Sequence, residues 1–525
     1  MEEKKKIAIL GGGFGGVYTA MYLQKWLKKI PHWEIVLITR ENYFVYQPML
    51  SEVIGGAVGI LDTVSPIEQI LPQIALVPRE IEEIDLEKKE ISISPKYTHT
   101  HQNIRYDHLV FALGNVTDFR GSIGLSEHAL PFKNLADALR IRNHIIDVID
   151  TAQVTKEVEL KKKLLTFVVG GGGFSGTEVA AEINDFVRNL AKSKPNIDPQ
   201  MIRVVLIHAK ERLMDKELSE SLSRYAEKIL KKKGVEILFN TRLTAATPEE
   251  IVLDNGEKIN CKTLISTVPV SSNPIIEALP LPKEKGRLKT DPYLQVIGTD
   301  HIWAVGDCAR IPLPDEKFCP PTAQFATRQA KVLAKNIIAS ILGEKKNPFF
   351  FKSLGILGAL GHRCAVAEIL GVKLSGVLAW IIWRTLYWIK LPGISRKIKV
   401  AISWFLDTLF PIDAIQLQMT PSQGITKLHF ETGDEIFREG DIGDFLYIIT
   451  EGAVEVIKGG KGIARLKKGE FFGEIALLNQ RTRTATIRCT EPTDVLALKK
   501  SDFGALVANF KELKETFEKT ERERS

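Results

Sequence analysis

The sequence predicts an α/β protein that ends in a smaller all-β domain. Two glycine-rich loops about 160 residues apart, each between an apolar strand and a helical pattern, predict two Rossmann-like domains. From about residue 421, short apolar strands alternate with glycines, which predicts an antiparallel β-roll with flanking helices. The segment before it predicts amphipathic helices. The expected domains are 1–116 with 295–345, 117–294, 346–418 and 422–525.

Length and composition set broad limits. The chain has 525 residues, enough for about three to four domains, and its net charge of +7 gives no argument for nucleic acid. Its five cysteines form no CxxC spacing, and none precedes residue 261. This argues against a disulfide framework, a zinc ribbon or an N-terminal dithiol, so we expect no metal site and a reducing compartment. The apolar run at the N-terminus is too short to predict a signal peptide.

The first glycine loop has GxGxxG spacing after the apolar strand 7–10. Its first glycine makes the tight turn, the second lets the backbone approach a pyrophosphate, and the third lets the helix pack closely on the strand. The helix N-terminus then faces the phosphates. This predicts a dinucleotide site, and the alternative is a turn without a ligand. The predicted contacts are Gly11, Gly13, Phe14, Gly15 and Gly16.

Three later features complete the first domain. The second strand, WEIVLIT, ends at Thr39 without the acidic residue that usually binds the ribose, and Arg40 follows. The strand in YDHLVFALG leads to Gly114, where the chain leaves the domain. In HIWAVGDCAR an apolar strand ends just before Asp307. We include Arg40, Gly114 and Asp307 among the candidate cofactor contacts.

The second glycine loop repeats the spacing after the strand 164–169. Two such loops in one chain predict a flavin in one domain and a nicotinamide in the other, with electrons passing between them. The predicted contacts are Gly171, Gly173, Phe174 and Gly176.

The second domain also lacks the acid that selects NADH. His208 stands where Glu or Asp would bind the 2′-hydroxyl, and Lys210 and Arg212 follow. Basic groups there are able to accept a 2′-phosphate, so the sequence leaves NADH and NADPH open. The alternative is that Lys210 and Arg212 belong to a solvated loop.

With these motifs in order, residues 1 to about 418 resemble the type II NADH:quinone oxidoreductases. The stretches NYFVYQPMLSEV, GGFSGTE and TAQFATRQA carry the resemblance together with the two loops. It implies an FAD enzyme that takes hydride from NAD(P)H and gives two electrons to quinone without pumping protons. It also implies that Asp307 accepts a hydrogen bond from the ribityl chain of FAD, and that a homodimer forms.

The resemblance also assigns roles to particular residues. Glu178, at the end of GGFSGTE, matches the glutamate beside the nicotinamide and flavin rings, although an acid in the first helical turn also suits the helix dipole. Ala323 and Gln324 match the start of the AQxAxQ motif, at the flavin and in the quinone pocket. Arg328 replaces the second glutamine, and Gln329 follows one place later. The implied catalytic residues are Glu178 and Gln324.

Other flavoprotein classes remain as alternatives. A glutathione-reductase-like enzyme needs a cysteine pair after the first loop, and residues 41–60 contain none. A sulfide:quinone reductase needs cysteines near the flavin, for which only Cys319 and Cys364 are candidates. A redox-sensing signalling flavoprotein and an enzyme with a soluble acceptor also fit the motifs.

Residues 373–411 predict a membrane anchor. They contain four of the seven tryptophans and six lysines or arginines, with no acid between Glu368 and Asp407. The apolar run from Leu374 to Ile389 is too short to span a bilayer and contains Arg384. We therefore expect helices lying on the lipid surface at the cytoplasmic face, next to lipid-dissolved quinone. A dimer interface or buried helices are the alternatives.

The tail, 422–525, resembles cyclic-nucleotide-binding domains through the cassette FGEIALLNQRTRTAT. The resemblance implies that Glu474 accepts the ribose 2′-hydroxyl, that Arg483 pairs with the cyclic phosphate and that Thr484 contacts phosphate or guanine. The ligand is then cAMP or cGMP, and binding is expected to regulate the enzyme. The alternative is a degenerate domain that dimerises or stabilises. The full candidate set is Gly473, Glu474, Ile475, Ala476, Arg483, Thr484 and Ala485.

Overall fold

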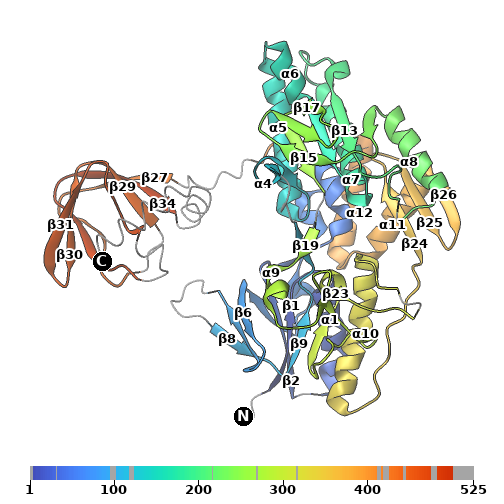
Figure 1. The fold of residues 1–525 in the computed structure, drawn as a ribbon, viewed down its shortest axis with the longest axis horizontal. Helices are drawn as coiled ribbons and strands as arrows, with labels where there is room; N and C mark the ends of the chain where they lie inside the picture. Colours follow the sequence, from blue (N-terminus) through green and yellow to red (C-terminus); the bar gives the residue numbers. More distant parts are fainter. Residues whose placement is uncertain are drawn as a thin grey trace. The chain divides into compact units, whose positions relative to one another are not determined.

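The structure is a computed structural model. It divides into two compact units, residues 1–417 and 418–525, and each is described by itself (Figure 1). The described residues are 4–30, 32–94, 102–117, 123–215, 217–267, 270–314, 317–410, 415–417, 425–441, 445–474 and 482–499.

The first parallel sheet joins strands that are far apart in the sequence. Its strands are continuous apolar runs because helices and loops cover both faces. The helix after the first glycine loop, α1 (Phe14–Trp26), packs along α10 (Ala323–Leu342), so the chain returns to this sheet after the second domain. The strand order is β22 (Ile302–Ala304), β9 (His108–Phe111), β1 (Lys5–Leu10), β2 (Trp33–Thr39) and β5 (Ala75–Pro78), all parallel.

A second parallel sheet follows the same plan around the second glycine loop. Helix α7 (Phe174–Ala191) begins at that loop and also packs on α2 (Leu50–Gly55) of the first region. The sheet's other helices are α5 (Leu135–Val154), α6 (Val158–Leu164) and α8 (Glu220–Lys232). The strand order is β11 (Leu130–Pro131), β18 (Thr263–Ser266), β12 (Thr166–Gly170), β13 (Arg203–Ile207) and β14 (Val235–Leu238).

Small sheets, antiparallel except where β21 pairs with β23, and short helices complete the first unit. The strands are β3 (Tyr43–Val45), β4 (Val64–Pro66), β6 (Ile81–Asp85), β7 (Glu90–Ile93), β8 (Gln102–Arg105), β10 (Asn115–Thr117), β15 (Leu243–Ala246), β16 (Glu250–Leu253), β17 (Lys258–Asn260), β19 (Val270–Ser272), β20 (Lys283–Glu284), β21 (Arg287–Lys289) and β23 (Ala309–Arg310). The short helices are α3 (Ile67–Ile70), α4 (Leu125–His128), α9 (Pro274–Ala278) and η1 to η5, at Leu27–Lys29, Gln47–Met49, Ile60–Thr63, Pro199–Met201 and Gly306–Cys308.

The segment expected to contain only anchor helices begins with a sheet. Strands β24 (Gly355–Ala359), β25 (Ala365–Ile369) and β26 (Val372–Ser375) form an antiparallel sheet, and α7 packs on β24. The two helices follow as α11 (Gly376–Lys390) and α12 (Ile394–Leu409). The prediction of helices is therefore wrong for residues 355–375.

The C-terminal unit is a β-roll, as the glycine-punctuated strands predicted. Its apolar side chains, among them Tyr447, Val454 and Phe472, form a core between two four-stranded sheets. The predicted C-terminal helix lies outside the described residues. The sheets are β27 (Ile425–Phe430), β34 (Thr493–Lys499), β29 (Phe445–Glu451), β32 (Phe471–Phe472) and β28 (Glu435–Phe437), β33 (Thr486–Cys489), β30 (Ala453–Lys458), β31 (Lys461–Lys467).

Candidate functional site

The first glycine loop forms a cradle of bare backbone between β1 and α1. Gly11 has a φ of +110°, and a Cβ on Gly16 would lie 1.9 Å from the Gly11 carbonyl oxygen. A Cβ on Gly13 or Gly114, by contrast, would meet open space. Strand and helix are thus in the closest contact that glycine permits, while the outer backbone stays accessible. This geometry suits the pyrophosphate of a dinucleotide such as FAD.

Asp307 stands at the start of the short helix that follows β22. Asn115 donates a hydrogen bond to its carboxylate at 3.0 Å, and the ammonium group of Lys133 donates to the Asn115 side-chain oxygen. Burial raises the pKa of Asp307 and lowers that of Lys133. The carboxylate is therefore oriented by neighbours that carry no sequence motif, and neither Asn115 nor Lys133 was predicted. Arg40 is exposed, and its guanidinium lies 3.8 Å from Glu80.

The second glycine loop repeats the cradle between β12 and α7. Gly171 has a φ of +114°, and a Cβ on Gly176 would lie 1.7 Å from the Gly171 carbonyl oxygen. A Cβ on Gly173 would meet nothing within 4 Å, so the outer backbone is again accessible. Phe174 begins α7 and lies against Gly358 of β24.

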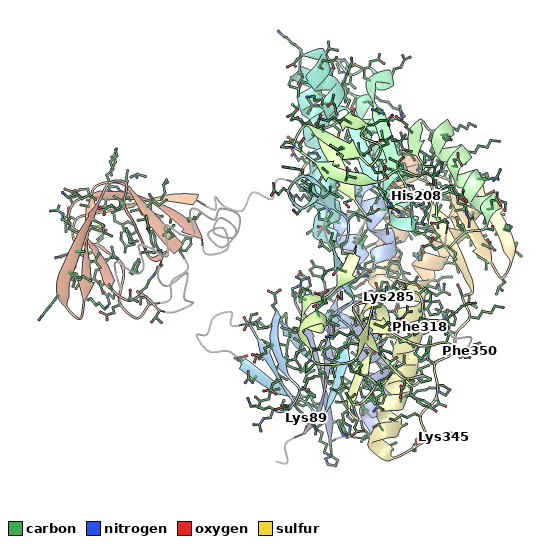
Figure 2. The ribbon with its side chains drawn as sticks, viewed as in Figure 1. Lys89, His208, Lys285, Phe318, Lys345 and Phe350 are labelled. Atoms are coloured by element: carbon green, nitrogen blue, oxygen red, sulfur yellow. The ribbon has the colours of Figure 1, made fainter. Side chains whose placement is uncertain are left out.

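His208 supports the second loop from the end of β13 (Figure 2). Its Nδ1 accepts a hydrogen bond from the Gly172 N–H at 3.1 Å, and its Nε2 lies 3.7 Å from the Asp215 carboxylate. Burial lowers its pKa, so the ring is neutral at neutral pH. Arg212 donates to the carbonyls of Asp215 at 2.7 Å and Leu218 at 3.1 Å. Its guanidinium therefore braces the loop, and Lys210 is exposed.

Glu178 is the fifth residue of α7, just beyond its first turn, and three groups from other elements lie near it. Its carboxylate accepts a hydrogen bond from the Ala359 N–H at 3.0 Å. Burial raises the pKa of Glu178 to about 8, and the nearby Glu52 carboxylate makes a smaller contribution in the same direction. Tyr387 of α11 lies close enough for its pKa to respond to Glu178, and its ring centroid is 6.1 Å from that of Tyr46. Tyr387 sits in the predicted anchor segment and was not predicted as a site residue.

Gln324 and Arg328, predicted for the quinone site, lie together on the first turns of α10. The Gln324 amide donates to the Gly355 carbonyl at 3.1 Å and accepts from the Leu354 N–H at 3.2 Å. Arg328 donates to the Gln324 carbonyl at 3.0 Å and covers the Phe351 ring at 4.1 Å. Burial lowers the pKa of Lys390, and the positive charge of Arg328 lowers it further, so the two cationic groups lie near each other.

Gln329, one place after the position of the motif's second glutamine, binds the backbone of the first domain. It is buried, and its side-chain oxygen accepts a hydrogen bond from the Gly306 N–H at 2.9 Å. Gln329 therefore fixes the backbone next to Asp307. Ala323 begins α10 directly after the capping residue Thr322.

The cysteines give no support to sulfur chemistry. All five are buried and unpaired with one another. Burial raises the pKa of both Cys308 and Cys319 to about 11, so both thiols stay protonated at neutral pH. Cys364 lies 4.0 Å from the Tyr225 hydroxyl.

Helices α11 and α12 expose an apolar surface. Ile398, Ile402 and Phe405 of α12 are 54%, 53% and 62% exposed. Lys390 and Lys399 are exposed on the same pair of helices. In the described part of the chain, no helix has both the length and the apolar character required to cross a bilayer. Other exposed members of this surface, here called the apolar face, are Val377, Leu378, Ile381, Ile389, Ile394, Leu406 and Leu409.

Arg384 does not belong to this face, although the sequence analysis counted it among the basic residues of the predicted anchor. It is only 7% exposed and pairs with the buried Glu52 carboxylate at 3.0 Å. Its guanidinium covers the rings of Trp380 and Trp404, at 4.1 and 4.7 Å from their centroids. The Trp404 indole also donates to Glu52, at 3.0 Å. One buried ion pair thus fastens both helices to α2.

The C-terminal unit contains a cavity of about 290 Å³ at the predicted nucleotide site. Glu474 and Arg483 are buried, and the guanidinium donates to the carbonyls of Gly473 at 2.8 Å and Phe445 at 2.7 Å. Five of the seven predicted residues line the cavity, whereas Ile475 and Ala476 lie outside the described residues. The lining is Phe437, Val456, Lys458, Ile463, Ala464, Leu466, Phe472, Gly473, Glu474, Arg483, Thr484, Ala485 and Ile487.

Known proteins that are similar to this chain agree with a fold that has two glycine-loop cradles. The family model "Pyridine nucleotide-disulphide oxidoreductase" matches residues 5–330. A type II NADH:quinone oxidoreductase of Staphylococcus aureus is 30% identical over 71% of this chain and 92% of its own length. The chain belongs to the type II NADH:quinone oxidoreductases. A demethylphylloquinone reductase of Synechocystis is 29% identical over 78% of this chain and 97% of its own.

The fold of this family extends through most of the first unit. The structure of NDH2 from Plasmodium falciparum in complex with NADH matches with a TM-score of 0.72 and 20% identity, over 78% of this chain and all of that one. Residues 427–510 match a second family model, "Cyclic nucleotide-binding domain". The chain therefore joins an NDH2-like flavoprotein fold to a cyclic nucleotide-binding domain.

Proposed function

We propose that the protein is a peripheral membrane NAD(P)H:quinone oxidoreductase that holds FAD in its first cradle. The observation that carries this proposal is the packing of α7 on α2 and β24, which puts Glu178 of the second cradle near Glu52 of α2 in the first region. Bound FAD would supply hydride acceptance from the nicotinamide and electron transfer to the quinone. The chain's own residues would bind and position the cofactor and the substrates.

Each residue's share follows from its contacts. The Gly13 and Gly114 backbone leaves room for the FAD pyrophosphate, and the oriented Asp307 carboxylate would accept a ribityl hydroxyl. Glu178 would position the nicotinamide and hold a proton near the rings, since its pKa is about 8.

On the quinone side, the contacts of Gln324 order the wall of the pocket. Its amide fixes the backbone at 354–355, and Arg328 and Lys390 concentrate positive charge beside it. Positive charge there would stabilise the negative charge that develops on a quinone oxygen as it accepts electrons.

The contacts around His208 favour NADH over NADPH. His208 is neutral and bonded to the Gly172 N–H, and Arg212 is bonded to loop carbonyls. Of these three described basic residues, Lys210 is therefore the one left to meet a 2′-phosphate. Comparing the two reductants under identical conditions tests this preference directly.

The apolar face fits the surface of a lipid bilayer. Its exposed isoleucine, leucine and phenylalanine side chains would enter the acyl boundary, and Lys399 would meet anionic headgroups. Because quinone dissolves in lipid, an enzyme docked in this way receives its substrate from the membrane. We propose the cytoplasmic face as the docking side, and the homodimer remains a prediction.

Binding of cAMP or cGMP in the cavity of the C-terminal unit would add regulation. The cavity joins a buried arginine and glutamate to apolar side chains, which is the chemistry that a cyclic phosphate, a ribose and a base require. Regulation then needs a difference in nucleotide affinity between two states of the enzyme.

Anaerobic spectroscopy tests the core of the proposal. The purified protein should be yellow, lose its flavin absorbance when NADH is added, and regain it when a soluble quinone follows. A colourless protein that takes up no added FAD would contradict the assignment. Bleaching without recovery on quinone would instead point to another electron acceptor.

A further inference from the structure

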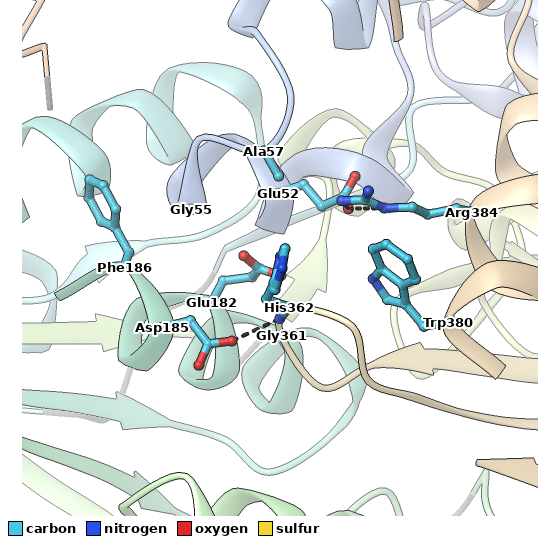
Figure 3. Close-up of a pocket in the computed structure, with 10 residues that line it drawn as sticks. All are labelled: Glu52, Gly55, Ala57, Glu182, Asp185, Phe186, Gly361, His362, Trp380 and Arg384. Carbon is cyan, nitrogen blue, oxygen red and sulfur yellow. Dashed lines mark hydrogen bonds and ion pairs between the residues drawn. The ribbon is translucent and has the colours of Figure 1, made fainter. Parts of the chain in front are cut away.

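A small polar cavity lies where α2, α7, α11 and the turn between β24 and β25 meet (Figure 3). Its volume of about 20 Å³ is enough for about one water molecule, which needs two to four polar partners. The carboxylates of Glu52, Glu182 and Asp185 on its walls supply such partners. The other lining residues are Gly55, Ala57, Phe186, Gly361, His362, Trp380 and Arg384.

Glu182 faces this cavity without a hydrogen-bond partner among the described residues, although it is only 8% exposed. A Cβ on Gly55 would lie 2.2 Å from the Glu182 Oε2, so the glycine leaves room for the carboxyl. A buried carboxylate without a donor is unfavourable, and burial raises the pKa of Glu182 well above its ordinary value. The groups that face it are Asp185 of the same helix, Glu52 of α2, Lys233 after α8, Arg384 of α11 and His362.

Three carboxyl groups follow one face of α7 from the surface to the second cradle. Asp185, Glu182 and Glu178 are spaced by three and four residues, which places them on neighbouring turns. At the outer end, the partly exposed Asp185 accepts hydrogen bonds from the Lys233 ammonium at 2.7 Å and from the His362 N–H at 2.8 Å. At the inner end stands Glu178.

We propose that Glu182 and the water site beside it relay protons from Asp185 at the surface to Glu178 in the second cradle. This rests on the proposed function, in which NADH and quinone give NAD⁺ and quinol. Hydride carries two electrons and one proton, whereas quinol formation takes up two electrons and two protons. One proton must therefore come from solvent. In each relay step one O–H bond breaks and another forms. The proton that leaves Glu178 ends in the second O–H bond of the quinol, and solvent returns a proton to Asp185.

The test compares Glu182→Gln with Glu227→Gln in the FAD-loaded, full-length protein. Gln keeps the size of Glu but cannot release a proton, and Glu227 is a carboxylate of α8 outside the cluster. Glu182→Gln should slow flavin reoxidation by quinone at least about tenfold and change its solvent deuterium isotope effect. Flavin reduction by NADH should change little, and Glu227→Gln should behave as wild type in both steps.

Infrared spectroscopy gives a readout that does not depend on turnover. The difference spectrum between low and high pH should contain a protonated carboxylic acid band that shifts in D₂O and is missing in Glu182→Gln. If Glu182→Gln does not fold, Glu182→Asp keeps the acid but shortens its reach, and should slow reoxidation to an intermediate rate. An unchanged reoxidation rate, isotope effect and infrared band in these variants would overturn the relay. A wild-type protein that retains the band but reduces no quinone would instead refute the proposed function.

Discussion

At the scale of single residues, the buried position of Glu178 should make stability depend on pH. Its pKa is raised from 4.5 to about 8, so between these values the folded protein keeps a proton that the unfolded chain has released. The free energy of unfolding should therefore fall as pH rises through this window. Glu178→Gln should remove a part of this fall on the order of a few kcal/mol, measured by urea unfolding at several pH values. An unchanged slope in the variant would contradict the raised pKa.

The glycines of the first cradle offer a matched pair of substitutions. Gly16→Ala places a Cβ 1.9 Å from the Gly11 carbonyl oxygen, whereas Gly13→Ala places one in open space. Gly16→Ala should lower the stability of the FAD-free protein by about 1–3 kcal/mol. Gly13→Ala should leave that stability unchanged and weaken FAD binding, because the added methyl takes up space next to the pyrophosphate. Thermal unfolding and flavin content separate the two effects, and equal stability loss in both variants would refute the described cradle.

The same residues show how far sequence reasoning reaches at this scale. Gly11, Gly16, Gly171 and Gly176 were predictable because backbone geometry leaves glycine as the residue that fits. The contacts of His208 with Gly172, and of Gln329 with Gly306, depend on side chains brought together from distant segments. No local pattern specifies such contacts, so the sequence left the task of both side chains open.

At the scale of elements, α12 should contribute most of its membrane affinity through three side chains. Replacing Ile398, Ile402 and Phe405 together with glutamine removes apolar groups that are more than half exposed. Binding to anionic lipid vesicles should weaken by about 2–4 kcal/mol, or roughly 30- to 1000-fold. Vesicle sedimentation measures this, and oxidation of NADH by a water-soluble quinone should persist.

The control for this experiment replaces three exposed apolar residues elsewhere in the chain. Val154, Val158 and Leu342 are 77%, 58% and 51% exposed, and none belongs to the apolar face. Their replacement by glutamine should leave vesicle binding intact. Equal loss in both triple variants would show that binding depends on general hydrophobicity, and the apolar face would then not be the docking site.

The segment predicted as an anchor also shows why helices and strands are predicted better than the contacts that surround them. The apolar stripe of α12 follows from helical periodicity, and most of it is exposed. The sheet of residues 355–375 has strands of only four or five residues, too short for the pattern to indicate where they pair. Arg384 was counted as a surface cation because its partner Glu52 lies 332 residues away in the sequence.

At the scale of the whole molecule, the first unit should work without the second. Residues 1–417 bury their own hydrophobic clusters and contain both cradles and the apolar face. A truncated chain of these residues should bind FAD and oxidise NADH with quinone at a rate close to that of the full chain. Turnover of the truncated chain should also be insensitive to cAMP and cGMP. Any response of turnover to nucleotide in that chain would place the effector site in the first unit.

The C-terminal unit should report nucleotide binding through its own unfolding transition. A ligand that binds only the folded state at a hundred times its dissociation constant stabilises by about 2.7 kcal/mol. In the full chain, cAMP or cGMP should therefore raise the melting temperature of one transition and leave the flavin-linked transition unchanged.

Arg483→Lys should abolish the rise, since a lysine cannot replace a guanidinium that meets Gly473, Phe445 and a phosphate together. Arg488→Lys, an exposed arginine of the same unit paired with Glu435, is the matched control and should keep the rise. A rise that survives Arg483→Lys would show that the nucleotide binds outside this cavity, and no rise in the wild type would favour a domain that only stabilises or dimerises.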